Sequence, residues 1–129
     1  MPNDNQTTLA ELKSEVQKFV GERDWEKFHS PKNISMAMSV EAAELMEHFQ
    51  WISQAESRQP DQQKLVEIGE EMSDVFCYLL ALANTLDIDF TAVFLRKMEL
   101  NRQKYPAEQF RGRFGADDPS PVSSNSTGD

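Results

Sequence analysis

The stretch from Gln62 to Leu86, QQKLVEIGEEMSDVFCYLLALANTL, decides the fold class of this chain. Its apolar residues recur every three or four positions, which is the spacing of one face of an α-helix. These residues are Leu65, Ile68, Met72, Val75, Leu79, Leu82 and Leu86. The pattern predicts a helix of about 25 residues. Gly69 lies inside it, at a cost of up to ~1 kcal/mol relative to alanine.

Two helices are predicted before this stretch. The first runs from about Thr8 to about Arg23, because Thr8 and Glu11 form a capping-box pattern ahead of an apolar periodicity. The second has Ser30 as its N-cap, followed by a proline at the first helical position, and is expected to end near Ser53.

The polar segment 54–61 contains a proline and is predicted to be a connection. After the long helix a fourth helix is predicted, with Asp89 as its N-cap and Pro106 as the residue that stops it. Residues 115–129 are rich in Pro, Ser, Gly and Asp and are predicted to form a disordered tail. Residues 1–114 are then expected to form one domain.

Four helices without an alternating strand pattern predict an all-α protein built as a helical bundle. The chain has 129 residues, which is enough for one hydrophobic core. The segment 75–82 is so apolar that three neighbouring helices would leave much of it exposed. A homo-oligomer that covers this surface is therefore expected.

The overall charge narrows the class of partner. Twenty-two acidic against thirteen basic residues give a net charge of −9, which argues against a nucleic-acid polymer. No apolar run is long enough to span a bilayer, and the N-terminal residues lack the pattern of a secretory signal. The single Cys77 fits a reducing compartment, so a cytoplasmic protein is expected.

Two pairs of acidic residues lie at helical spacing, Glu41 with Glu44 and Glu71 with Asp74. Acids on helices are most often solvated surface charges. Here, however, the neighbours of the second pair are apolar positions that normally face a core. If the two helices are antiparallel neighbours, the four carboxylates converge, and a cation is needed to offset their repulsion.

Carboxylate ligands without clustered cysteine or histidine favour magnesium, manganese or calcium over zinc. Magnesium also takes phosphate oxygens, so such a centre suits a polyphosphate substrate. A di-iron centre is disfavoured, because it requires two Glu-x-x-His motifs and only Glu26 to His29 has this form.

Further along the chain, a spacing of four residues separates Lys97, Asn101 and Tyr105, and this pattern indicates phosphate binding. The alternative is that cations near the end of the helix only complement the helix dipole. Trp25 and Trp51 indicate base stacking near the metal, with ordinary packing as the alternative.

These motifs resemble the all-α nucleoside triphosphate pyrophosphohydrolases, the MazG-like superfamily. The signature Glu-x-x-Glu followed by Glu-x-x-Asp is Glu41 to Glu44 and Glu71 to Asp74 here. The surrounding strings are similar to the dCTP pyrophosphatase branch over roughly residues 8–106. They are ERDWEKFH (22–29), ELMEHFQW (44–51), EEMSDV (70–75) and KMELNRQKYP (97–106).

This resemblance implies Mg²⁺-dependent conversion of a deoxynucleoside triphosphate, with dCTP or 5-modified dCTP favoured, to the monophosphate and pyrophosphate. It implies a homo-oligomer, often a dimer of dimers. It also implies a set of metal ligands, namely Glu41, Glu44, Glu71 and Asp74. The implied base and sugar pocket consists of Trp25, His29, Trp51 and Tyr78. The side chains implied near the phosphates or sugar are Lys97, Asn101 and Tyr105.

Glu41 and Glu44 are the candidate catalytic residues, because a carboxylate can orient or deprotonate the attacking water. Other substrates on the same scaffold remain open, among them dUTP, general nucleoside triphosphates and phosphoribosyl-ATP. A non-catalytic helical interaction module is the alternative of another class.

Overall fold

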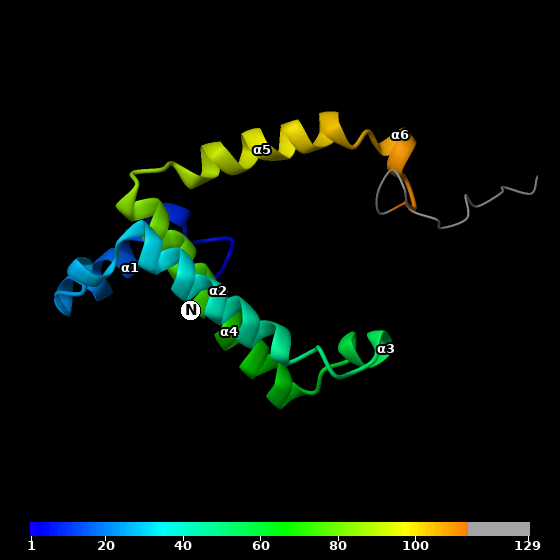
Figure 1. Cartoon of the computed structure of the whole chain (residues 1–129), viewed down its shortest axis with the longest axis horizontal. Helices are drawn as coiled ribbons and strands as arrows, with labels where there is room; N and C mark the ends of the chain where they lie inside the picture. Colours follow the sequence, from blue (N-terminus) through cyan, green and yellow to red (C-terminus); the bar gives the residue numbers. More distant parts are fainter. Residues whose placement is uncertain (114–129) are drawn as a thin grey trace, which may run out of the picture. The chain divides into compact units, whose positions relative to one another are not determined.

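The structure is a computed structural model that describes residues 1–113. In chain order the helices are α1 (Leu9–Glu22), the 3₁₀ helix η1 (Glu26–Phe28), α2 (Pro31–Glu47), α3 (Gln54–Ser57), α4 (Gln62–Thr85), α5 (Phe90–Lys104) and α6 (Ala107–Phe110). No strand occurs within the described part of the chain (Figure 1), which confirms the all-α prediction.

The chain divides into two compact units, Met1–Asp89 and Phe90–Asp129, and each is described by itself. The expected single domain of residues 1–114 therefore stays a prediction. The expected disordered tail, residues 115–129, lies outside the described residues.

The first helix begins as its sequence predicts. The Thr8 hydroxyl accepts a hydrogen bond from the Glu11 amide at 3.2 Å, and the Thr8 amide donates to the Glu11 carboxylate at 2.6 Å. This reciprocal pair is the capping box, and it satisfies backbone donors that have no partner inside the helix.

Helices α1 and α4 end in the same way, with an aspartate in the left-handed backbone conformation. Asp24 and Asp87 both have a φ of 52°. After α1 the Trp25 amide donates to the Val20 carbonyl at 3.1 Å, and the equivalent bond after α4 has a length of 2.9 Å. These are Schellman turns, in which a left-handed residue lets the chain leave the helix sharply.

The second helix is shorter than predicted. It ends at Glu47, not near Ser53, and residues 48–52 form a turn. At the end of α2 the backbone changes to hydrogen bonds between residues three apart, such as that from the Phe49 amide to the Met46 carbonyl at 2.9 Å. After the turn, the Ser53 hydroxyl accepts from the Glu56 amide at 3.1 Å and caps a new one-turn helix, α3. The segment predicted as a connection therefore contains a helical turn, and Trp51 lies in the turn before it.

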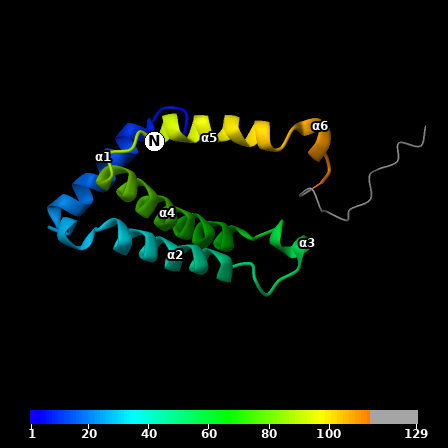
Figure 2. The ribbon, with the colours of Figure 1, turned by 45° about the horizontal axis from the view of Figure 1, so that its top comes forward.

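Helices α2 and α4 pack side by side along the first unit and run in opposite directions, while α1 packs against α4 (Figures 1 and 2). The buried apolar residues come from all three helices. They are Val20, Ile34, Ile68, Leu80, Ala81 and Ala83. The antiparallel pairing assumed from the sequence is thus present, and it brings the acidic faces of α2 and α4 together.

The described part of the second unit contains α5 and the short α6. Helix α5 begins directly after Asp89 and ends before Pro106, as the sequence predicts. The Tyr105 and Phe110 rings meet edge to face with centroids 5.2 Å apart, which holds α6 against the end of α5.

Candidate functional site

A cluster of carboxylates lies where α2 and α4 face each other. Glu41 and Glu44 come from one face of α2 and Glu71 comes from α4; one oxygen from each lies within 4.8 Å of the others. Asp74 lies one turn beyond Glu71 and is exposed. Its negative charge still raises the pKa of both Glu41 and Glu71, so all four predicted ligands interact electrostatically.

Glu41 is the most perturbed member of this cluster. Burial of its carboxyl group is the largest cause of a pKa raised from 4.5 to about 7. A hydrogen bond with Glu44 and the negative charges of the other three acids raise it further. In the absence of a cation, Glu41 is therefore protonated to a much larger extent near neutral pH than an ordinary glutamate.

Glu71 responds to the same surroundings from the opposite helix. Its pKa is raised first by burial and then by the charges of Glu44 and Asp74. Two buried oxygens, Oε2 of Glu41 and Oε2 of Glu71, find no hydrogen-bond partner among residues 1–113. A buried acceptor without a partner is costly, so the protein maintains an arrangement that needs a positive ligand.

The donor set fits a divalent cation that prefers oxygen ligands. The converging side chains all offer carboxylate oxygens, and Oε2 of Glu41 and Oε2 of Glu71 accept no hydrogen bond from residues 1–113. Glu41, Glu44 and Glu71 are positioned to hold such an ion, with Asp74 at the edge of the group. Sequence spacing alone indicated this centre, and the structure brings three of its four members into ligand distance of one another.

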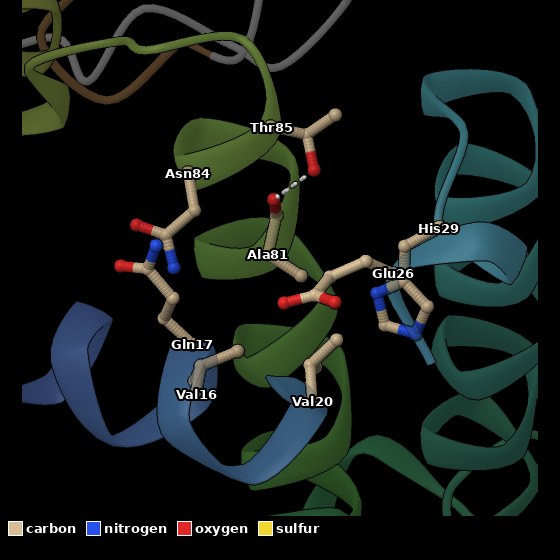
Figure 3. A pocket seen from close by; sticks show the side chains of 8 residues that line it. All are labelled: Val16, Gln17, Val20, Glu26, His29, Ala81, Asn84 and Thr85. Carbon is tan, nitrogen blue, oxygen red and sulfur yellow. Dashed lines mark hydrogen bonds between the residues drawn. The ribbon is translucent and has the colours of Figure 1, made fainter. Parts of the chain in front are cut away.

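A cavity of about 250 Å³ lies at the other end of α4, between α1, η1 and α4. Figure 3 shows its lining side chains, which are Val16, Gln17, Val20, Glu26, His29, Ala81, Asn84 and Thr85. The Gln17 and Asn84 amides approach each other on one side, and the Glu26 carboxylate points into the space between α1 and α4. The cavity therefore combines apolar walls with groups able to hydrogen-bond a polar ligand.

His29 connects this cavity to the predicted base pocket. Its ring centroid lies 6.4 Å from that of Tyr78, the next predicted pocket residue. Burial is the largest cause that raises the pKa of the Tyr78 phenol, and the negative charge of Glu41 is the second. His29, which follows η1, and Tyr78, which lies two turns after Glu71 on α4, are thus brought together.

The two tryptophans are placed differently from this pair. Trp25 packs edge to face on Phe19 with ring centroids 5.8 Å apart, and the Arg23 guanidinium lies over the same two rings. Trp51 is 87% exposed in the turn after α2. Within the described first unit, Trp25 therefore makes ordinary packing contacts, while Trp51 offers its ring to solvent.

The predicted phosphate-binding residues Lys97, Asn101 and Tyr105 lie on or just after α5, in the second unit. The Tyr105 amide donates to the Asn101 carbonyl at 2.8 Å, and the Lys104 ammonium lies 5.3 Å from the Tyr105 ring centroid. Their grouping with the carboxylates stays a prediction.

Sequence reasoning missed the polar cavity residues Gln17, Glu26 and Asn84. A signal was present for Asn84, because an amide stands there among the apolar residues of the long helix. Its side-chain amide donates to the Lys13 carbonyl at 2.9 Å, which ties α4 to α1. No spacing rule reveals Gln17 or Glu26, since they belong to segments whose packing partners are distant in sequence.

The fold and the carboxylate cluster define an all-helical protein with a centre suited to a divalent cation. Residues 36–113 match the model of the MazG-like family. The chain belongs to the MazG-like family.

Similar proteins agree with this assignment. The chain is 41% identical over 109 residues to dCTP pyrophosphatase 1 of Rattus norvegicus and 39% identical over 106 residues to dCTP pyrophosphatase 1 of Homo sapiens. Each match covers 81% of this chain, but only 63% and 62% of those proteins. The chain therefore spans less than two thirds of the length of these relatives.

A solved structure is similar over nearly its whole length. It is a pyrophosphatase from Archaeoglobus fulgidus, 36% identical to this chain, with a TM-score of 0.73. The match covers 82% of this chain and 99% of that one. The helical arrangement is thus that of a known pyrophosphatase fold.

Proposed function

We propose that this protein is a Mg²⁺-dependent nucleoside triphosphate pyrophosphohydrolase that converts dCTP or 5-modified dCTP to the monophosphate and pyrophosphate. The observation that carries the proposal is the convergence of Glu41, Glu44 and Glu71 within 4.8 Å, with two buried oxygens that lack a donor among residues 1–113. The similarity to dCTP pyrophosphatase 1 supports the choice of substrate.

The carboxylates perform two tasks in this proposal. Glu41, Glu44, Glu71 and Asp74 hold the ion. When bound, magnesium neutralises charge on the phosphoryl oxygens and stabilises the pyrophosphate leaving group. Glu41 or Glu44 orients the attacking water and takes its proton.

Recognition of the nucleoside is assigned to the His29 side of the first unit. His29 and Tyr78 present adjacent rings, and the cavity beside His29 supplies carboxylate and amide groups that can hydrogen-bond base edges. Trp25 and Trp51 are proposed to complete the base and sugar pocket, and exposed Trp51 is the ring free to stack on a base. Lys97, Asn101 and Tyr105 are proposed to approach the phosphates or the sugar.

The exposed apolar side chains on α2 and α4 support a homo-oligomer, proposed here as a dimer of dimers. Met36 and Val40 are each 58% exposed, and Met72 is 56% exposed. Large apolar side chains exposed to this extent on two neighbouring helices are often covered by another chain. Light scattering combined with size-exclusion chromatography measures the mass in solution, and a monomer at all concentrations contradicts the oligomer.

Other partners and the cellular location remain part of the proposal. The net charge of −9 supports the absence of a nucleic-acid partner. Among the described residues no single helix is long and apolar enough to cross a membrane; α4 and α5 meet that criterion only when taken together. A cytoplasmic location is proposed from the single cysteine.

Pyrophosphate release with magnesium, measured over dCTP, 5-methyl-dCTP, dUTP, ribonucleotides and phosphoribosyl-ATP, tests the activity. The proposal predicts the fastest release from dCTP or its 5-modified form. Equal rates on ribonucleotides and deoxynucleotides contradict the preference for dCTP.

Thermal unfolding separates the enzyme from a non-catalytic helical module. A ligand at a hundred times its dissociation constant stabilises the fold by ~2.7 kcal/mol. We expect magnesium with dCTP to raise the melting temperature accordingly, whereas an interaction module predicts no change.

A further inference from the structure

Next to the carboxylate cluster, toward α3, a second group of charged side chains links α2 to α4. The Lys64 ammonium lies 3.4 Å from Nδ1 of His48 and 3.1 Å from a carboxylate oxygen of Glu67. None of the three belongs to the proposed metal ligands or to the predicted nucleoside pocket. The mechanism proposed above gives these three side chains no role.

The contact between Lys64 and His48 sets the state of the imidazole ring. An ammonium group can only donate hydrogen bonds, so Nδ1 of His48 accepts from Lys64. In the neutral ring the proton is then on Nε2, which is the donor that His48 offers. The pair thus presents N–H donors from two helices.

This group continues the carboxylate cluster along the same helix faces. His48 follows Glu44 by one turn, and Lys64 precedes Glu71 by seven residues, which is about 10 Å along a helix axis. The spacing lies within the combined reach of a polyphosphate chain and a flexible lysine side chain.

A polyphosphate entering this site meets four carboxylates, which one divalent ion does not neutralise completely. Further cationic donors are therefore needed beside the metal. We propose that Lys64 and His48 bind phosphate oxygens of the substrate's polyphosphate chain, next to the metal centre. The inference rests on the proposed function and adds two phosphate-binding side chains to that site.

The ion pair of Lys64 permits this role. The side chains of Lys64 and Glu67 are 43% and 40% exposed. Exposed ion pairs contribute little to stability, so Lys64 can turn from Glu67 to a phosphate at small cost. Glu67 then acts as a positioning residue that keeps the ammonium near His48 while the site is free.

Isothermal titration calorimetry of the full chain with magnesium alone and with magnesium pyrophosphate tests the inference. We expect Lys64→Gln to weaken pyrophosphate binding roughly tenfold, as the loss of a charge-assisted hydrogen bond predicts. Magnesium affinity should stay within about twofold, because the carboxylates are unchanged. Lys64→Arg, which keeps the charge and N–H donors, should recover most of the binding.

Lys27→Gln is the matched control, because Lys27 forms a similar exposed ion pair with Asp24 at 3.1 Å, outside the carboxylate cluster. Unchanged pyrophosphate binding in Lys64→Gln overturns the inference, as does a parallel loss of magnesium and pyrophosphate affinity or a wild type that binds no pyrophosphate. A wild type that binds magnesium pyrophosphate in a Lys64-dependent way but hydrolyses no nucleotide supports the inference and refutes the proposed function.

Discussion

The two halves of α4 differ in the interactions that their side chains make. The C-terminal half buries Leu80, Ala81 and Ala83, each at most 4% exposed, in ordinary apolar packing. The N-terminal half places Glu71 against Glu41 and Glu44, with raised pKa values and unsatisfied oxygens. The comparison teaches that the C-terminal half is stabilised by apolar packing, whereas the N-terminal half combines the buried Ile68 with carboxylates whose repulsion a bound cation would relieve.

Glu71→Gln should give the largest effect, because it changes the strained half only. Loss of one proposed metal ligand should lower pyrophosphate release from dCTP by at least about a thousandfold, since a bound metal contributes several kcal/mol to transition-state stabilisation. The metal-free variant should be as stable as the wild type or more stable, because a repulsive charge is gone.

The neighbouring exposed Glu70→Gln is the control for this experiment, and it should retain full activity. Initial rates and urea midpoints in a chelator measure both properties. Near-wild-type activity in Glu71→Gln removes Glu71 from the metal site.

Leu80→Ala tests the other half of the helix. Leu80 is 2% exposed, so truncation leaves a cavity and should lower the free energy of unfolding by about 3 kcal/mol. Val66→Ala, at a position that is 52% exposed on the same helix, should cost much less. Equal losses in the two variants, measured by urea unfolding, contradict the placement of Leu80 in the core.

The pH dependence of stability sharpens the contrast further. The folded state raises the pKa of Glu41 from 4.5 to about 7, so protonation of Glu41 favours folding. This contribution is fully present below pH 4.5 and is lost as the pH rises through about 7. Metal-free wild type should therefore lose stability relative to Glu41→Gln across this range.

Urea unfolding in chelator at several pH values measures that difference, and saturating magnesium should abolish it. A constant difference between the two proteins from acidic to neutral pH means that Glu41 titrates normally and is not strained.

Gly69→Ala should give the smallest effect, a gain of about 0.5–1 kcal/mol from helix propensity. Apart from its chain neighbours and the backbone of its own helix, a methyl group at this position meets no atom of the described residues within 4 Å, so no close packing within residues 1–113 explains the glycine. Chemical denaturation measures the gain. A loss of stability instead indicates that another chain approaches the helix at Gly69, as the proposed oligomer allows.

Much of this architecture was readable from local patterns. The capping box at Thr8, the N-cap at Ser30 and the long apolar period of α4 each act within a few residues, so the sequence predicts them. The end of α2 was mispredicted, because the apolar spacing continues to Ile52, past the helix end at Glu47. The backbone there changes to hydrogen bonds between residues three apart, such as that from the Phe49 amide to the Met46 carbonyl, and periodicity does not specify this change.

By itself, the sequence determined the all-α class and the two acidic pairs, since both follow from helical periodicity. Only the tertiary structure decided that α2 lies against α4 with Glu41, Glu44 and Glu71 converging, that their charges raise one another's pKa, and that Lys64 contacts His48. The physical reason is that electrostatic coupling depends on distances between segments far apart in the chain, which periodicity does not specify.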